Sequence, residues 1–136
     1  MNITVDANIL FSALLKDGET RRLWFNIEFT LFAPAYLLVE FSKYKIELLK
    51  KFMGSSEEFD DWTGKLVSQI KFIPDEELIS FLPAAATLLT DSNDWLYLAC
   101  ALKEDTILWS QDKGFLEQKR IKVKNTKEMR EEFGGF

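Results

Sequence analysis

Residues 2–15, NITVDANILFSALL, set out the plan on which the rest of the chain is built. The run 2–5 is short and rich in β-branched residues, which favours a strand, and the apolar residues from Ile9 to Leu15 follow helical spacing. Asp6 stands between the two. The sequence therefore predicts a carboxylate at the carboxyl end of a strand and at the start of a helix.

Helices and strands alternate along the remainder of the sequence. Ser55 and Glu58 form a capping box at the start of one helix, Gly54 ends the helix before it, and Pro34 suits the first turn of that earlier helix. Helices are expected at 19–26, 36–53, 55–71, in a weaker region up to 89 that is broken near Pro83, at 94–102 and after 126, and strands at 2–5, 29–33, 72–73, 106–110 and 121–123. This alternation predicts an α/β fold with a parallel, covered sheet, in a single domain of residues 1–136.

The composition excludes several classes of catalyst. The chain has 136 residues, 47% of them apolar, which is enough for one substantial core. It has no histidine, which excludes His general-base nucleases, H-E-x-x-H zinc proteases and Ser-His-Asp triads, so any catalysis must use carboxylates. The single Cys100 cannot form an intrachain disulfide, and no apolar run approaches the ~20 residues of a membrane span. We therefore expect a cytoplasmic protein with no membrane partner.

Four acidic residues are the candidates for chemistry. Asp6 and Asp112 both follow strands directly, and the carboxyl ends of parallel strands share one edge of a sheet. Asp94 near a helix N-terminus and Glu40 on the flank of an apolar stripe could point to the same edge. Carboxylates gathered without histidine or cysteine suit magnesium or manganese. Most of these acids also have an ordinary interpretation: Asp94 and Asp91 as helix caps, Asp112 as a turn residue and Glu40 as an exposed helix residue.

Four segments together resemble a known family. They are VDANIL at 5–10, LVE at 38–40, DWLYLACAL at 94–102 and WSQDKGF at 109–115. In order, spacing and chain length they closely resemble PIN domains, and the resemblance covers nearly the whole chain.

The resemblance implies a three-layer α/β/α fold around a mostly parallel sheet of about 4–5 strands. It implies an endoribonuclease with Mg²⁺ or Mn²⁺ in an acidic pocket, and includes toxins of VapC type that pair with an antitoxin; similar proteins are commonly oligomers, so a homodimer is also considered. Carried over by position, the acidic set is Asp6, Glu40, Asp94 and Asp112, with Asp91 as an alternative to Asp94. Asn8 and Ser110 match polar residues that would orient ligands or water.

The sequence also offers candidate contacts for RNA and two rival functions. Candidate phosphate contacts are Arg21, Arg22, Lys43 and Lys113, although an exposed basic side chain is by default a solvated surface group. The net charge of -5 argues weakly against a nucleic-acid partner, but residues 113–130 hold seven basic and two acidic residues. One rival is a catalytically silent scaffold, whose interface would use an apolar cluster of Leu14, Leu15, Leu23, Trp24 and Phe25. A second rival is a magnesium-dependent phosphoryl-transfer domain, such as an aspartyl-phosphate phosphatase. The sequence argues against it, because it lacks the Asp-x-Asp with which those phosphatases start.

Overall fold

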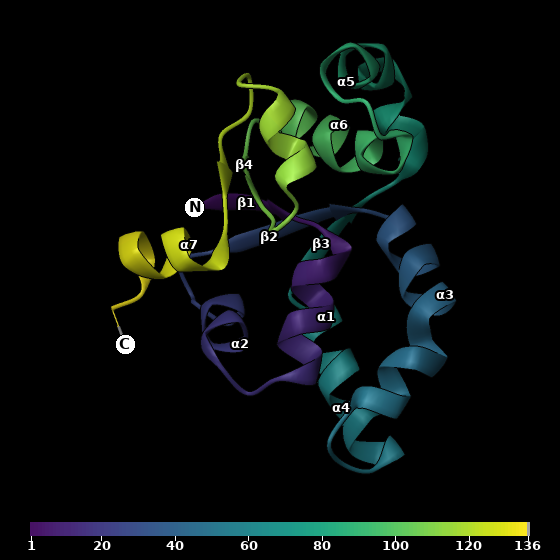
Figure 1. Ribbon diagram of the computed structural model, residues 1–136, viewed down its shortest axis with the longest axis vertical. Coiled ribbons are helices and arrows are strands. Elements are labelled where there is room, and N and C mark those ends of the chain that lie inside the picture. The colour runs from purple at the N-terminus through teal and green to yellow at the C-terminus, as the bar shows by residue number, and fades with distance from the viewer. Residues whose placement is uncertain (136) are drawn as a thin grey trace.

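The computed structural model describes residues 1–135 and is built around a five-stranded sheet in the order β3-β2-β1-β4-β5, in which every neighbouring pair is parallel (Figure 1). The strands are β1 (Asn2–Val5), β2 (Thr30–Pro34), β3 (Ile70–Ile73), β4 (Ile107–Trp109) and β5 (Val123–Lys124). The chain winds from β1 outward to β3 and then returns to the other side of β1 for β4. The reversal of winding leaves a crevice at the carboxyl ends of β1 and β4, where ligands bind in sheets of this kind.

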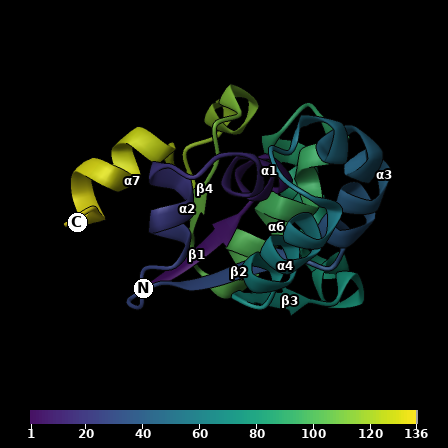
Figure 2. The same ribbon diagram turned by 90° about the horizontal axis from the view of Figure 1, so that it is seen from below.

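Helices cover both faces of the sheet (Figures 1 and 2). On one face lie α1 (Ala7–Leu15), α2 (Glu19–Trp24), α3 (Tyr36–Lys51) and α4 (Ser56–Val67), and on the other lie α5 (Leu82–Leu88) and α6 (Trp95–Glu104). The final helix, α7 (Thr126–Phe133), packs against α2. Short 3-10 helices occupy Asp75–Phe81, Ser92–Asp94 and Lys113–Glu117. The predicted three-layer α/β/α architecture with a parallel sheet is confirmed.

Three local predictions differ from the structure. Pro34 ends β2 instead of opening a helix, and it is tolerated there because the pairing of β2 with β1 stops at Phe32, so the missing N–H of Pro34 is not needed. The helix expected to reach residue 71 ends at Val67, because Ile70 and Lys71 pair with Leu31 and Phe32 of β2. The weak helical region divides into a 3-10 helix and α5, with Pro83 in the first turn of α5.

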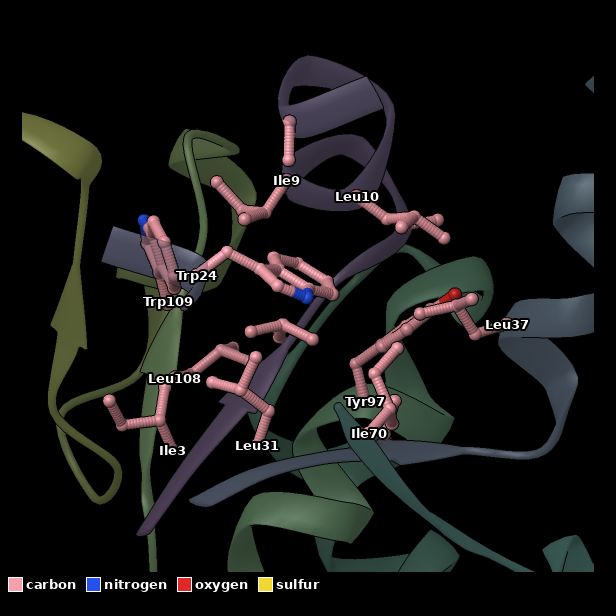
Figure 3. Packing of buried hydrophobic residues seen from close by; sticks show 14 of the residues in the cluster. Ile3, Ile9, Leu10, Trp24, Leu31, Leu37, Ile70, Tyr97, Leu108 and Trp109 are labelled. Atoms are coloured by element: carbon pink, nitrogen blue, oxygen red, sulfur yellow. The ribbon is translucent and has the colours of Figure 1, made fainter. Parts of the chain in front are cut away.

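The core lies between the sheet and the helix layers. Trp24 and Trp109 meet with ring centroids 6.2 Å apart, above the aliphatic side chains of the sheet (Figure 3). Trp24 donates its indole N–H to the carbonyl oxygen of Leu66 at 2.9 Å, so its polar atom is also satisfied. Leu14, Leu23 and Trp24 are almost completely buried, while Leu15 and Phe25 pack partly buried against the core. The apolar cluster considered as an interface is therefore core packing in the main.

None of the helices in residues 1–135 is long and apolar enough to cross a membrane.

Candidate active site

Asp6 is held at the crevice by three elements of the fold. It is only 5% exposed, and it caps α1, accepting a hydrogen bond from the N–H of Ile9 at 3.0 Å. The hydroxyl of Ser110, which directly follows β4, donates to the other carboxylate oxygen of Asp6. The two strands on either side of the crevice are thus joined through this carboxylate.

Asp112 is joined to the same hydroxyl. Its backbone N–H donates to Ser110 Oγ at 2.9 Å, and its Oδ1 accepts from the N–H of Gly114 at 2.8 Å. The ordinary interpretation as a turn residue is therefore right for Asp112, and the turn also fixes where the carboxylate points. Ser110 therefore contacts both residues, through the carboxylate of Asp6 and through the backbone N–H of Asp112.

The carboxylate of Asp94 does not cap a helix in the structure. It occupies the N-cap position of α6, but its side chain makes no capping hydrogen bond. Asp91 does the capping instead, by accepting from the N–H of Asn93 at 3.0 Å at the start of the preceding 3-10 helix. A Cβ at Gly114 would lie 3.1 Å from Asp112 Oδ1 and 3.4 Å from Asp94 Oδ2. The carboxylates of Asp94 and Asp112 therefore flank the same backbone position.

Glu40 joins the site through a residue that the sequence reasoning missed. Tyr97 on α6 donates its hydroxyl hydrogen to Glu40 Oε1, across the gap between α6 and α3. The ring of Tyr97 is buried in the core, with its oxygen turned toward the helix that carries Leu37 (Figure 3). The available signal was position, since Tyr97 follows Asp94 by three residues and so lies on the same face of the helix.

Burial, together with neighbouring carboxylates, raises the pKa values of Asp6 and Asp94. Burial, opposed by the hydrogen bonds from Ser110 and Ile9 and reinforced by the charges of Asp112 and Glu40, raises the pKa of Asp6 to about 6. Burial, followed by the charge of Asp112 and then those of Asp91, Asp6 and Glu40, raises the pKa of Asp94 to about 7. Like charges in a partly desolvated site disfavour ionisation, and a cation would reverse the effect.

The donor set suits a hard divalent cation, although its atoms are not gathered around one point. Asp6, Glu40, Asp94 and Asp112 offer only oxygen ligands, as magnesium and manganese prefer. Within residues 1–135, no three Asp, Glu or Cys side chains are arranged closely enough to hold a metal ion as they stand. The oxygen ligands fit the ion by their chemistry, but the positions of their atoms do not form a metal-binding cluster within residues 1–135.

The four candidate phosphate contacts have different surroundings. Arg21 is buried, donates to the carbonyl oxygens of Ala13 and Leu14 at 2.8 and 3.0 Å, and lies 3.9 Å from the ring centroid of Trp62. Its guanidinium is engaged inside the fold, so we do not retain Arg21 as a phosphate contact. Arg22, Lys43 and Lys113 are exposed.

Asn8 and Glu40 stand at one end of a cleft of about 1020 Å³ between α1 and α3. Arg22 lines the same cleft from α2. Asn8 is exposed and lines this cleft, and its expected role in orienting ligands or water stays a prediction.

The parallel sheet and the acids at its topological switch define a three-layer α/β/α protein with an acidic site at the carboxyl edge. The family model described as PIN domain matches residues 4–134, and the chain belongs to the PIN domain family. Proteins of this family are generally nucleases, which supports hydrolysis of nucleic acid as the class of reaction. No curated protein sequence matches the chain.

Solved structures share the fold at low sequence identity. VapBC2 from Rickettsia felis, bound to a DNA fragment from its promoter, matches with a TM-score of 0.66 and 16% identity over 92% of this chain and 98% of the other. FitAB bound to the IR36 DNA fragment matches with a TM-score of 0.63 and 12% identity over 91% and 94%. FitAcB from Neisseria gonorrhoeae matches with a TM-score of 0.57 and 14% identity over 91% and 97%.

Proposed function

We propose that the chain, as a single domain in the cytoplasm, is a metal-dependent endoribonuclease that hydrolyses RNA phosphodiester bonds at Asp6, Glu40, Asp94 and Asp112. The observation that supports the proposal is that burial, reinforced by the charges of acidic residues from separate segments, raises the pKa values of Asp6 and Asp94 at the carboxyl edge of the sheet. Such repulsion costs the fold stability, and a cationic ligand would relieve it. Membership in the PIN domain family supports a nucleic acid as the substrate.

The proposed cofactor is Mg²⁺ or Mn²⁺. When bound, such an ion favours attack by water on a phosphodiester and neutralises charge on the departing oxygen. Asp6, Glu40, Asp94 and Asp112 would hold it, with the exposed Asp91, whose charge acts on Asp94, as the alternative to Asp94. The carboxylate oxygens would have to move closer together than they lie in the structure.

The carboxylates differ in how firmly the protein holds them. Ser110 and the N–H of Ile9 fix Asp6, the N–H of Gly114 fixes Asp112, and Tyr97 fixes Glu40. No hydrogen bond is recorded for the side chain of Asp94 in the described part of the chain. We infer that Asp94 is the carboxylate that adjusts when a cation or a substrate enters.

The substrate would meet the protein on both sides of the acids. Arg22 lines the cleft, Lys43 lies beside it with its ammonium 5.5 Å from the ring centroid of Tyr44, and Lys113 follows Asp112 directly. These three cations are the proposed phosphate contacts, and the amide of Asn8 is the proposed polar contact at the cleavage position. The acidic net charge of -5 means that RNA contacts must be concentrated near the site.

A protein partner and a second copy of the chain are further parts of the proposal. The resemblance to VapC-type toxins and the fold shared with VapBC2 and FitAB support a role as the toxin of a toxin–antitoxin pair. The antitoxin would neutralise the nuclease, and a homodimer would be the form of the toxin. Co-purification with the product of a neighbouring gene, followed by loss of RNase activity in the complex, is the measurement that tests this role.

The decisive test of the chemistry is Asp6→Asn. Asparagine caps a helix as well as aspartate does, so α1 keeps its start while the site loses one negative charge. We expect D6N to lose magnesium-dependent cleavage of single-stranded RNA by about 100-fold or more, at unchanged or higher thermal stability. The matched control is Asp60→Asn, which removes an exposed carboxylate from α4 and should cleave like the wild type. Full cleavage by D6N would rule out the proposed site.

A further inference from the structure

The cleft of about 1020 Å³ begins at the acidic site and leads away from it. Its two walls are α1 and α3, which both start at the carboxyl edge of the sheet, after β1 and β2, and run side by side away from that edge (Figure 1). Residues of α2 and Thr126 at the start of α7 line it as well. Glu40 is the one of the four candidate acids that lines the cleft, so a ligand in it would have one end beside Glu40.

The side chains that α1 contributes to the cleft change from polar to aromatic and then to aliphatic along the helix. Asn8, Phe11, Ser12 and Leu15 line the cleft at the helical spacing that places residues on one face, and Lys16 follows them just after the end of α1. Asn8 is nearest the acids and Lys16 follows the last turn of the helix. From Asn8 to Lys16 the helix advances by about 12 Å.

The wall from α3 repeats the same series. Glu40, Tyr44, Leu48 and Lys51 line the cleft in that order, over an advance of about 16 Å. The aromatic members of the two series meet, because the rings of Phe11 and Tyr44 form an edge-to-face pair with centroids 5.9 Å apart. Both walls thus offer a polar residue at the acidic site, then an aromatic ring, then an aliphatic side chain, and a lysine at the far end.

Two of the acids that line the cleft, Glu19 and Glu47, have basic partners. Glu19 accepts from Arg130 at 2.8 Å, and Glu47 pairs with Lys51 at 3.1 Å. The pair of Glu47 and Lys51 is well exposed, at 59% and 61%, and such pairs contribute little, so a phosphate could replace the carboxylate of Glu47.

We propose that this cleft binds the single-stranded nucleotides on one side of the scissile phosphate, with a base against Phe11 and Tyr44 and phosphates at Lys16 and Lys51. The inference rests on the proposed ribonuclease function and adds to it a direction for the strand. Stacking of bases on aromatic rings, together with basic side chains that contact the phosphates, is a common way to bind single strands with little sequence preference. The ammonium of Lys43, close to the ring of Tyr44, adds a cation next to the stacked base. A protein segment is the competing occupant.

The test measures binding without cleavage. Fluorescence anisotropy of a short, labelled single-stranded RNA is followed with D6N protein, into which the cleft variants are introduced. Tyr44→Leu, which keeps apolar bulk but removes the ring, should weaken binding about tenfold, and Tyr44→Phe should not. Lys51→Gln should reduce the slope of log affinity against log salt by about 0.7, the value for one phosphate contact on a single strand.

Matched controls lie on the outer side of the same helix. Ile46→Ala and Lys50→Gln alter exposed residues of α3 that do not line the cleft, and both variants should bind RNA with unchanged affinity and salt dependence. Thermal unfolding of each variant verifies that the helix is intact.

The outcomes separate the subsite from the function. Cleavage of RNA by the wild type, together with normal RNA binding by Y44L and K51Q, would overturn the subsite alone and would leave the cleft to a protein partner. Failure of the wild type to cleave RNA and of D6N to bind it would overturn the proposed function and the subsite together. Weakened binding by Y44L and K51Q, with unchanged controls, supports the subsite.

Discussion

At the scale of single residues, the site depends on the groups that hold the carboxylates as much as on the carboxylates themselves. Ser110 contacts Asp6 and Asp112 at once, which links the segments after β1 and β4 through one hydroxyl. Tyr97 does for Glu40 what Ser110 does for Asp6. Partners of this kind fix the orientation of metal ligands and typically change metal affinity about 10- to 100-fold when they are removed.

Tyr97→Phe isolates the contribution of the Tyr97 hydroxyl. The ring stays in the core, but Glu40 loses its donor, so we expect the dissociation constant for Mn²⁺ to rise by about tenfold. Isothermal titration calorimetry measures the affinity, and melting temperature reports on the fold. In a Glu40→Gln background, the same substitution should have almost no further effect, because Tyr97 acts through Glu40.

The control for Y97F is Tyr36→Phe. Tyr36 packs against Tyr97 with ring centroids 6.5 Å apart, and no hydrogen bond of its hydroxyl is recorded in residues 1–135. Y36F should therefore bind Mn²⁺ like the wild type. Unchanged affinity in Y97F, or an equal loss in the Glu40→Gln background, would show that the hydroxyl does not act through Glu40.

The sequence predicts the acids more readily than it predicts their partners. Asp6 and Asp112 follow strands, so the rules of parallel sheets place them on one edge. The strand pattern does not identify the partners of Tyr97 and Arg21. A tyrosine in an apolar helix and an arginine in a charged one have many ordinary roles, so their sequence positions alone do not say what they contact. The hydroxyl of Tyr97 bonds Glu40, which is far away in the sequence, and the guanidinium of Arg21 bonds two backbone carbonyls of the preceding helix. Only folding brings these groups together.

At the scale of elements, the sequence predicts which helices and strands exist and misplaces some of their ends. Every expected strand occurs, because each is a short apolar run between turn residues. The predicted boundary between α4 and β3 was wrong. The helical spacing of apolar residues continues through Ile70, but Ile70 pairs with Leu31 of β2 and so belongs to the sheet. Tertiary pairing of this kind overrides local pattern and is not visible in one segment.

Gly64→Ala tests the energetics of α4 apart from the site. Gly64 lies inside the helix, and a Cβ at this position would have no heavy atom within 4 Å apart from its sequence neighbours and the backbone of its own helix. Alanine should therefore raise the free energy of unfolding by about 0.5–1 kcal/mol, because glycine loses more backbone freedom in a helix. Urea denaturation measures the change. A destabilised G64A would mean that the surface of α4 at this point is not open.

The contrasting position is Gly114, which lies between Asp94 and Asp112. Here a Cβ would come within 3.1 Å of Asp112 Oδ1 and 3.4 Å of Asp94 Oδ2, so the absence of a side chain leaves room for both carboxylates. The two glycines show that the same residue type is replaceable on a helix surface and constrained at the site.

At the scale of the whole molecule, the buried acids at the site lower the stability of the folded protein, and the proposed cation would offset this loss. The folded protein binds protons at Asp6 and Asp94 more tightly than the unfolded chain does, because their pKa values rise from 3.8 to about 6 and about 7. Between about pH 4 and pH 7 the folded state therefore holds more protons, and the contribution of these two groups to the free energy of unfolding falls as pH rises. Without a bound cation, the destabilisation caused by ionising Asp6 and Asp94 is therefore largest above neutral pH.

Asp94→Asn should remove part of that cost. We expect the melting temperature of D94N, without metal, to equal that of the wild type near pH 4 and to exceed it by on the order of a few degrees at pH 7.5. Asp60→Asn, which removes an exposed carboxylate outside the site, should show no such trend with pH. Saturating Mn²⁺ should stabilise the wild type more than D94N, because the ion binds only the folded state and uses the carboxylate that D94N lacks. Calorimetric melting across this pH range, with and without Mn²⁺, measures both effects. A difference between D94N and the wild type that stays constant with pH would mean that Asp94 is not destabilised by its acidic neighbours.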